Sequence, residues 1–249
     1  MGEIKYFFPI PYTFIPLCKY MKKKRIVVFT GAGISAESGL KTFRDSGGLW
    51  EEFKVEDVAT PEAWENNPAR VLEFYNMRRR QAVNAKPNPA HLALVQLETI
   101  YDVQIITQNI DDLHEKAGSK KILHLHGEIN KCRSSMDDLL IYPMKGSDLK
   151  MGHLCEKGSQ LRPHIVWFGE FVPMMEHANA LAASADLFII IGTSLNVYPA
   201  AGLVNFVPEK TPKYLIDPQG VSKDYIPNLI INREKAGIGV PELVKNLLK

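Results

Sequence analysis

The sequence has few cysteines, little net charge and no uninterrupted hydrophobic run of membrane-spanning length. Its three cysteines, Cys18, Cys132 and Cys155, are an odd number and lie far apart, which argues against a secreted disulfide framework and favours a reducing compartment. The net charge of +2 at pH 7 gives no indication of binding to a nucleic acid. We therefore expect a cytoplasmic protein whose partners include no nucleic acid and no membrane.

Residues 1–20 come closest to a membrane segment, because they are mostly apolar and aromatic. Pro9, Pro11 and Pro16 interrupt them, and a spanning helix needs about 20 suitable residues and tolerates interior proline poorly. No small-residue cleavage site of a signal peptide follows, whereas Met21 begins a stretch that reads like a natural start. We interpret residues 1–20 as an N-terminal extension that packs on the surface or frays, or as a wrongly assigned start.

The length of 249 residues suits one large α/β domain, with or without a small insert. Buried-type strands alternate with amphipathic helices, and this alternation predicts a Rossmann-like parallel sheet with helices on both faces. Asn67-Pro68 and Asn88-Pro89 are typical helix starts. The predicted strands cover residues 26–30, 103–107, 122–125, 164–168, 187–192, 213–217 and 228–232, and the predicted helices cover 34–38, 67–85, 89–100, 174–184, 199–206 and 241–248.

Two stretches lack this alternation. Residues 41–60 are polar and aromatic without periodicity, so we expect a long loop, which in a compact domain is usually functional or disordered. Residues 128–162 contain Gly, Lys, Ser and two cysteines, and we expect a small irregular insert there.

A glycine turn follows the first strand. Gly31-Ala32-Gly33-Ile34-Ser35-Ala36 fits the pattern G-x-G-x-x-G/A between a strand and a helix, where backbone N–H groups can approach a pyrophosphate. A glycine turn without a ligand remains an alternative. A usual dehydrogenase also places an acidic residue about 20 residues later, at the end of a second strand. Here that position falls at Glu51 and Glu52 inside a loop, which weakens the case for hydride transfer.

Four further motifs extend the pattern. Together with the stretch at 31–50, the sequence resembles the sirtuins, the NAD-dependent protein lysine deacylases, in the same motif order over residues 22–249. The four motifs are "TQNIDDLHEKAG" (107–118), "LHLHGEI" (123–129), "RPHIVWFGE" (162–170) and "IGTSLNVYPAAGL" (191–203).

The resemblance implies a set of contacts to NAD as co-substrate. The glycine turn corresponds to the pyrophosphate site, the stretch with Phe43 and Arg44 to a loop over the nicotinamide ribose, and Asn232 matches less closely a contact to the adenine ribose. The implied NAD-binding residues are Gly31, Ala32, Gly33, Ile34, Phe43, Arg44, Gln108, Asn109, Asp111, Gly192, Thr193, Ser194 and Asn232.

The resemblance also implies the chemistry. His126 corresponds to the general base, while Asn109 and Asp111 hold the ribose and a water, and the products are free lysine, nicotinamide and O-acyl-ADP-ribose. Two segments take the acylated peptide between them as a third strand; their residues are Val166, Trp167, Phe168, Gly169, Glu170, Asn196 and Val197. Taken singly, these residues allow other interpretations, since Trp167 and Phe168 could belong to a core, and either His124 or His126 could be a hydrogen-bonded core histidine.

Tyr75 and Arg78 lie three residues apart, so they share one face of the predicted helix. The pair is similar to the Tyr-x-x-Arg of the sirtuin branch that removes acidic acyl groups. A guanidinium can pair with the carboxylate of a succinyl or malonyl group, so we expect activity on such groups and also on acetyl groups. The alternative is that Tyr75 is a core residue and Arg78 belongs to an exposed basic cluster.

The sequence departs from the family at the zinc site. Sirtuins usually carry two Cys-x-x-Cys pairs that bind a structural zinc, but Cys132 is followed by Ser135 and Cys155 by Gly158 at the partner positions. We therefore predict no metal and a degenerate zinc ribbon; the alternative is a metal site completed by His153 and nearby Asp residues. By the same resemblance, residues 21–50, 86–127 and 163–249 form the Rossmann-like NAD-binding domain, and 51–85 and 128–162 a small inserted domain.

Three alternatives to a deacylase use the same sequence features. A hydride-transferring dehydrogenase lacks its expected acidic residue. A non-catalytic module that binds NAD or ADP-ribose would not need His126, Asn109 and Asp111. Mono-ADP-ribosyl transfer would use the same site, with proteins rather than an acyl group as acceptor.

Overall fold

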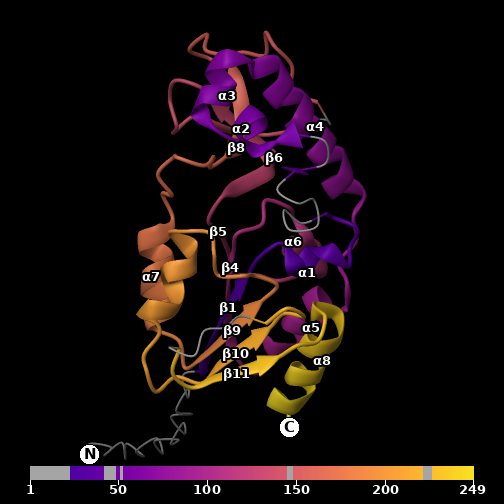
Figure 1. Ribbon diagram of the computed structural model, residues 1–249, viewed down its shortest axis with the longest axis vertical. Coiled ribbons are helices and arrows are strands. Elements are labelled where there is room, and N and C mark those ends of the chain that lie inside the picture. Colours follow the sequence, from indigo (N-terminus) through magenta and orange to yellow (C-terminus); the bar gives the residue numbers. More distant parts are fainter. Residues whose placement is uncertain (1–22, 42–48, 51–52, 145–147, 221–225) are drawn as a thin grey trace, which may run out of the picture.

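A computed structural model describes residues 23–41, 49–50, 53–144, 148–220 and 226–249. Its larger part is a six-stranded sheet in the order β11-β10-β9-β1-β4-β5, in which every neighbouring pair is parallel (Figure 1). The α/β Rossmann-like fold predicted from the sequence is therefore confirmed. The strands are β1 (Arg25–Thr30), β4 (Asp102–Thr107), β5 (Ile122–His124), β9 (Leu187–Ile191), β10 (Lys213–Ile216) and β11 (Leu229–Asn232).

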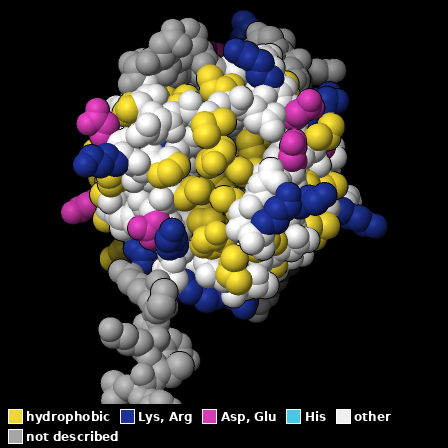
Figure 2. All heavy atoms as spheres, turned by 90° about the horizontal axis from the view of Figure 1, so that it is seen from below, with side chains coloured by type: hydrophobic (Ala, Val, Ile, Leu, Met, Phe, Trp, Pro, Cys, Tyr) yellow, Lys and Arg dark blue, Asp and Glu magenta, His cyan; other side chains and the backbone are white. Residues whose placement is uncertain are grey.

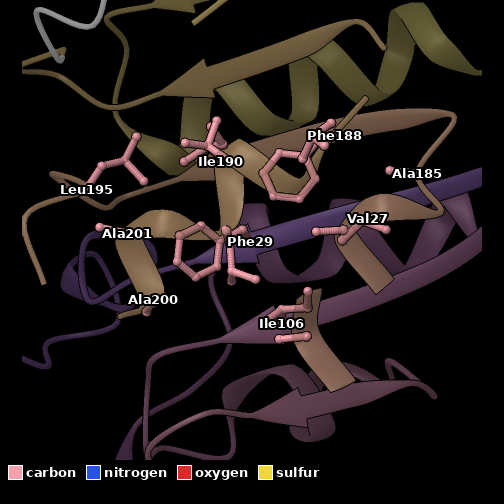
Figure 3. Packing of buried hydrophobic residues seen from close by; sticks show 14 of the residues in the cluster. Val27, Phe29, Ile106, Ala185, Phe188, Ile190, Leu195, Ala200 and Ala201 are labelled. Carbon is pink, nitrogen blue, oxygen red and sulfur yellow. The ribbon is translucent and has the colours of Figure 1, made fainter. Parts of the chain in front are cut away.

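Both faces of the central strands are buried, which explains why their sequences are apolar throughout rather than alternating. Val27 and Phe29 of β1 point to one face, where they join Phe188 and Ile190 of β9 (Figure 3). The residues between them, such as Val28, point to the other face. Helix α7 (Met175–Ala183) and the 3₁₀ helix η1 (Ala200–Phe206) cover the first face, and α1 (Gly33–Ala36), α5 (Pro89–Leu97) and α8 (Ala236–Leu247) cover the second.

A smaller part of the molecule lies beyond the carboxyl ends of the strands (Figure 1). It holds a three-stranded antiparallel sheet in the order β7-β6-β8, packed on helices through Phe74, Ile129 and Trp167. Its elements are β6 (Gly127–Ser134), β7 (Ile141–Pro143), β8 (Leu161–Ile165), α2 (Val55–Val58), α3 (Pro61–Asn66) and α4 (Pro68–Asn84), with the two-stranded pair β2 (Leu49–Trp50) and β3 (Phe53–Lys54) nearby and α6 (Leu113–Ala117) after β4.

Several predicted boundaries need correction. Residues 128–162 are not irregular, since they contain most of a three-stranded sheet whose alternation is masked by buried polar residues such as Arg133. The expected loop at 41–60 contains α2, where Val55 and Val58 are spaced to share one helical face. The last helix begins at Ala236 rather than Pro241, because tertiary packing of Val240 holds its first turns despite the internal proline.

The two asparagine caps are confirmed. Asn67 accepts a hydrogen bond from the Arg70 N–H with its side chain, and Asn88 accepts one from the Ala90 N–H, with proline at the first helical position in each case. The Asn88 amide also donates to the Ile34 carbonyl oxygen over 2.7 Å. The start of α5 is thereby fixed to the turn that follows β1.

On the face shown in Figure 2, charged side chains of one sign do not dominate. Hydrophobic side chains gather at its centre, and both basic and acidic side chains lie around its rim (Figure 2). Among the described residues, none of the helices combines the length and the apolar character needed to cross a bilayer.

A close backbone contact joins the turn after β1 to the end of β9. The Gly33 N–H donates to the Gly192 carbonyl oxygen over 2.8 Å, and the Gly31 N–H donates to the Ile191 carbonyl oxygen over 3.0 Å. Gly192 has a φ of +60°, and a Cβ added to it would lie 2.6 Å from the Gly33 Cα. Only glycine therefore fits at this crossing.

We expect Gly192→Ala to lower the free energy of unfolding by about 3 kcal/mol or more, because it combines an unfavourable φ with overlap against backbone that cannot move away. Chemical denaturation measures the change. Gly202→Ala in η1 is the matched control, since an added Cβ there meets no atom within 4 Å, and its effect should stay below about 1 kcal/mol. Equal effects of the two substitutions would contradict the close contact.

Candidate active site

A cavity of about 700 Å³ opens at the carboxyl ends of β1, β4 and β9, between the large sheet and the smaller part of the molecule. This is the position at which ligands bind in open α/β sheets. It brings together residues predicted from widely separated motifs, namely Gly31, Ala32, Gly33, Arg78, Gln108, Asn109, Asp111, His126, Val166, Trp167, Phe168, Gly169, Glu170, Gly192, Thr193, Ser194 and Val197.

The other predicted residues are placed differently. Ile34 and Tyr75 are fully buried in the two cores on either side. Neither they nor Asn196 and Asn232 are among the residues that line the cavity. Asn232 ends β11 and caps the following turn by accepting a hydrogen bond from the Glu234 N–H. The remaining two, Phe43 and Arg44, lie outside the described residues.

The glycine turn offers fewer backbone donors than the sequence pattern suggests. The N–H groups of Gly31 and Gly33 bond to the end of β9, and those of Ile34 and Ser35 bond within the turn itself. The Ala32 N–H has no partner within the described part of the chain, and Ala32 lines the cavity. It is the donor of this turn that remains for an anion.

A hydrogen-bonded cluster lies beside the turn. The Asn109 side-chain amide donates to the Gly31 carbonyl oxygen and to Ser35 Oγ, each over 3.1 Å. Ser35 Oγ in turn donates to Asp111 Oδ2 over 3.0 Å. Burial raises the pKa of Asp111, while the Leu113 N–H and the Ser35 hydroxyl oppose that effect. The cluster fixes two polar side chains at the end of β4.

Ser35 was missed as a functional candidate in the sequence, although it lies within the glycine motif. Its hydroxyl is buried and links Asn109 to Asp111. The signal was its place in the first helical turn of the motif, beside the expected phosphate site. The pattern alone could not show its role, because its partners lie 74 and 76 positions away, in the loop after β4.

His126 lines the cavity from the other side. Its Nδ1 lies 3.0 Å from the Gln108 carbonyl oxygen, and since a carbonyl only accepts, Nδ1 carries the proton and Nε2 is left as a base. Burial lowers the pKa of His126, and the Gln108 carbonyl opposes that effect. The imidazole is therefore held neutral with its free nitrogen available to a ligand.

The segment from Val166 to Glu170 forms a turn at the mouth of the cavity. The Val166 N–H donates to the His126 carbonyl oxygen, the Phe168 N–H to the Ala59 carbonyl oxygen, and the Glu170 N–H to the Trp167 carbonyl oxygen. In the described part of the chain the Gly169 N–H has no partner. It remains available to a peptide that lies along this turn.

Glu170 faces inward rather than toward the opening. Its carboxylate accepts hydrogen bonds from the Arg162 guanidinium over 2.8 and 3.1 Å, from Arg133 over 3.2 Å and from the Trp167 N–H over 2.7 Å. The Arg162 guanidinium also stacks on the Trp167 ring at 3.2 Å. These contacts hold the turn in place, which is a different task from the predicted contact with substrate.

Arg78 lies in the wall of the cavity, where its guanidinium donates to Gln81 Oε1 over 3.2 Å. Tyr75, one turn earlier on α4, lies in the core behind this wall, in edge-on contact with Phe74. Burial raises the pKa of Tyr75, and the positive charges of Arg162 and Arg78 oppose that effect. Of the predicted pair, Arg78 therefore lines the cavity, whereas Tyr75 lies in the core behind it.

Comparison with known proteins identifies the family. The Sir2 family model matches residues 31–199. A protein named NAD-dependent protein deacylase from Bacteroides thetaiotaomicron is 50% identical over 230 residues, which is 90% of this chain and 98% of the relative. One of the same name from Helicobacter pylori is 50% identical over 226 residues, covering 91% of this chain and 98% of the relative.

This chain belongs to the Sir2 family. Among solved structures, a Sir2 homologue in complex with NAD is 38% identical, with a TM-score of 0.81 and coverage of 91% of this chain and 90% of that one. A mutant Sir2 homologue in complex with ADP-ribose gives a TM-score of 0.82 at 38% identity, with coverage of 91% and 92%. The resemblance inferred from the five motifs is confirmed.

The residues of this Sir2 protein fit NAD. Gly31 and Gly33 have no room for side chains against Gly192 and Thr193, and the Gln108 side chain is fixed by a 3.1 Å hydrogen bond to Thr193 Oγ1, past the end of β1, which lies between β4 and β9. The Ala32 N–H, as a donor for a pyrophosphate, and polar groups for a ribose therefore face one cavity. Gly192, Thr193 and Ser194 close its far side.

The structural zinc of the family does not fit this chain. Cys132 is buried beside Leu72 and Leu149, while Cys155 Sγ lies 3.0 Å from Ser159 Oγ, which also contacts Ser134 Oγ at 2.7 Å. Among the described residues no group of three or more His, Cys, Asp or Glu side chains could hold a metal ion. A hydroxyl and thiol network occupies this end of the small sheet.

We expect the purified protein to contain no stoichiometric zinc and to keep its unfolding temperature in a strong chelator, as elemental analysis and thermal unfolding would measure. Ser159→Ala should lower the free energy of unfolding by about 1–2 kcal/mol, because it removes two side-chain hydrogen bonds. Ser135→Ala, at one of the positions where a zinc cysteine is missing, should change it little. About one zinc per chain, lost together with stability in the chelator, would contradict this account.

Proposed function

We propose that this Sir2 protein removes acyl groups from protein lysines with consumption of NAD, and that it prefers acyl groups ending in a carboxylate. NAD-dependent deacylation is the activity named for its curated relatives. The observation that supports it most directly in this chain is the convergence of the His126 imidazole and the Asn109, Ser35 and Asp111 cluster on one cavity with the glycine cradle. The partners of such an enzyme are proteins with acylated lysine side chains.

NAD supplies a ribose carbon that becomes electron-poor as nicotinamide departs, so that a weak nucleophile such as an acyl oxygen can bond to it. The protein then acts mainly by positioning the reacting groups, which can lower the barrier by about 7–11 kcal/mol. Asn109 and Asp111 are held rigidly enough to orient a ribose and a water. Their fixed dipoles need no reorganisation during the reaction.

His126 is suited to remove a proton from a ribose hydroxyl. Its Nδ1 is tied to the Gln108 carbonyl, so Nε2 is the basic nitrogen, and burial keeps the ring neutral. Proton removal makes that ribose oxygen able to attack the acyl carbon. His126 then holds the proton until a leaving group or water takes it.

The turn at residues 166–170 is the proposed binding site of the acylated peptide. With the N–H groups of Val166, Phe168 and Glu170 already bonded, the Gly169 N–H is the backbone donor for a substrate strand, a form of β-strand addition. The exposed ring of Phe168 and the side chain of Val197 flank the opening. They supply apolar walls for the lysine stem.

Arg78 is the proposed partner of the acyl carboxylate. Among the described residues it is the arginine that lines the cavity, and a guanidinium pairs with a carboxylate through two parallel hydrogen bonds that a neutral acetyl group cannot form. Tyr75, buried behind it, would reach the acyl group only through a shift of its surroundings.

We further propose that the protein acts in the cytoplasm, which its odd cysteine number supports.

His126→Ala should abolish NAD-dependent release of nicotinamide and deacylated peptide, while His177→Ala, at an exposed position of α7 outside the cavity lining, should not. In the wild type, the acid limb of the pH profile of kcat/KM should lie below 6.5, the ordinary imidazole value, because burial lowers the pKa of His126 and the base stays neutral to lower pH. Mass spectrometry of the peptide across the pH range measures both. An acid limb above 6.5 would contradict the role of burial.

Arg78→Met should lower kcat/KM for a succinyl-lysine peptide by about 10- to 100-fold, the range expected for a lost charge-assisted hydrogen bond. Activity on the acetyl-lysine peptide should change by less than about threefold. Arg80→Met is the matched control, since Arg80 pairs with Asp148 at the surface and should affect neither substrate. Equal losses on both peptides would show that Arg78 does not select the acyl group.

A further inference from the structure

His124, two residues before the proposed base, has two partners that can only accept hydrogen bonds. Its Nδ1 lies 3.0 Å from the Asn109 carbonyl oxygen and its Nε2 lies 2.8 Å from Glu115 Oε1. A carbonyl and an ionised carboxylate both lack a proton to give, so both ring nitrogens must donate. The geometry therefore requires an imidazolium at this position.

The two histidines of β5 and its continuation hold consecutive carbonyls of one loop. His126 donates to the Gln108 carbonyl and His124 to the Asn109 carbonyl. Only His126 lines the cavity, and the His124 side chain is 9% exposed. His126 thus keeps Nε2 free for a ligand, whereas both ring nitrogens of His124 are hydrogen-bonded to the protein.

We infer that His124 is a positioning residue, which holds Asn109 by its backbone carbonyl and so sets the ribose-binding end of the cavity. The inference rests on the proposed NAD site. The Asn109 side chain is fixed separately by the Gly31 carbonyl and Ser35. Of its backbone groups, the N–H donates to the Thr107 hydroxyl and the carbonyl accepts from His124, so the His124 bond fixes the peptide unit that follows Asn109.

The charges around the ring support this assignment. Those facing His124 are Glu115 and the buried His114 on α6, Glu128 on β6, and Asp111 in the loop after β4. Burial lowers the pKa of His124, but the hydrogen bond and charge of Glu115, the Asn109 carbonyl and Glu128 outweigh it, so the pKa is raised above its ordinary value.

Deprotonation of this ring would release Asn109. A neutral imidazole has one N–H, and next to a carboxylate that N–H stays on Nε2, because a hydrogen bond to an ion is stronger than one to a carbonyl. The Asn109 bond is therefore present while the ring is charged, and it is lost as the pH rises through the raised pKa of His124. The nucleotide site should weaken in the same range.

Four variants separate the bond from the charge. His124→Asn keeps a donor near the position of Nδ1 and does not titrate. His124→Gln keeps one near Nε2 and loses the Asn109 bond. With Glu115→Gln the carboxamide can donate to Nε2, so that a neutral ring keeps its proton on Nδ1 and the bond to Asn109. Lys157→Met removes a surface charge paired with Asp137 and serves as the control.

The measurements are ADP-ribose binding by calorimetry across the pH range and the ¹⁵N spectrum of the His124 ring. We expect wild-type affinity to fall about fivefold to tenfold toward alkaline pH, the size of one hydrogen bond. His124→Gln should be weakened by a similar factor below pH 6.5. His124→Asn and Glu115→Gln should bind like the wild type below pH 6.5 without the alkaline loss, and Lys157→Met should follow the wild type throughout.

Several outcomes would overturn the inference. A neutral wild-type ring at pH values below 6.5 would do so, as would equal weakening in His124→Asn and His124→Gln, or a loss of binding that only follows a lower unfolding temperature. No binding of ADP-ribose by any variant would also end it. If the predicted binding pattern is found but acylated peptides release no nicotinamide, the proposed function fails and the positioning role of His124 stands.

Discussion

Direct backbone contact between the turn after β1 and the end of β9 is the constraint on which the site depends. The chain can approach this closely only because Gly31, Gly33 and Gly192 have no side chains. The contact brings the ends of two strands and the start of α1 to one point. From there the Gln108 amide reaches Thr193, and the Asn109 amide reaches the Gly31 carbonyl oxygen. The floor of the cavity is thus built from main chain, which resists deformation better than side chains do.

Around this floor, Glu170 and His124 hold loops, whereas Arg78 is the charged group proposed to meet the acyl group. Glu170 is bonded to Arg162 and Arg133, and its carboxylate closes the turn that contains Trp167. His124 spans Asn109 and Glu115 in a comparable way. Buried ion pairs add little net stability compared with well-packed apolar groups. Their value here lies in fixing the geometry of two irregular segments that no regular secondary structure could hold.

The smaller sheet is held by polar contacts at one end and by apolar packing elsewhere. Ser134, Ser159 and Cys155 form a hydrogen-bonded group at its end, and Cys132 packs as a small apolar residue. Another core, which contains Phe74, Tyr75 and Trp167, packs against the sheet. Trp167 of this core also lines the cavity, so apolar packing supports that wall.

The sequence by itself determined the parallel sheet, the two asparagine caps, the glycine turn and the family. These features rest on local rules: continuous apolar strands, capping residues and short motifs with fixed spacing. The tertiary structure alone decided which N–H groups remain free in the glycine turn, that Glu170 faces two arginines, and that His124 and His126 serve different tasks although both stand in "HLH". It also revealed the strands of residues 128–162, where buried polar side chains hide the alternation. The physical reason is that hydrogen-bond partners come from segments far apart in the chain, and a motif specifies a residue but not the groups that fold against it.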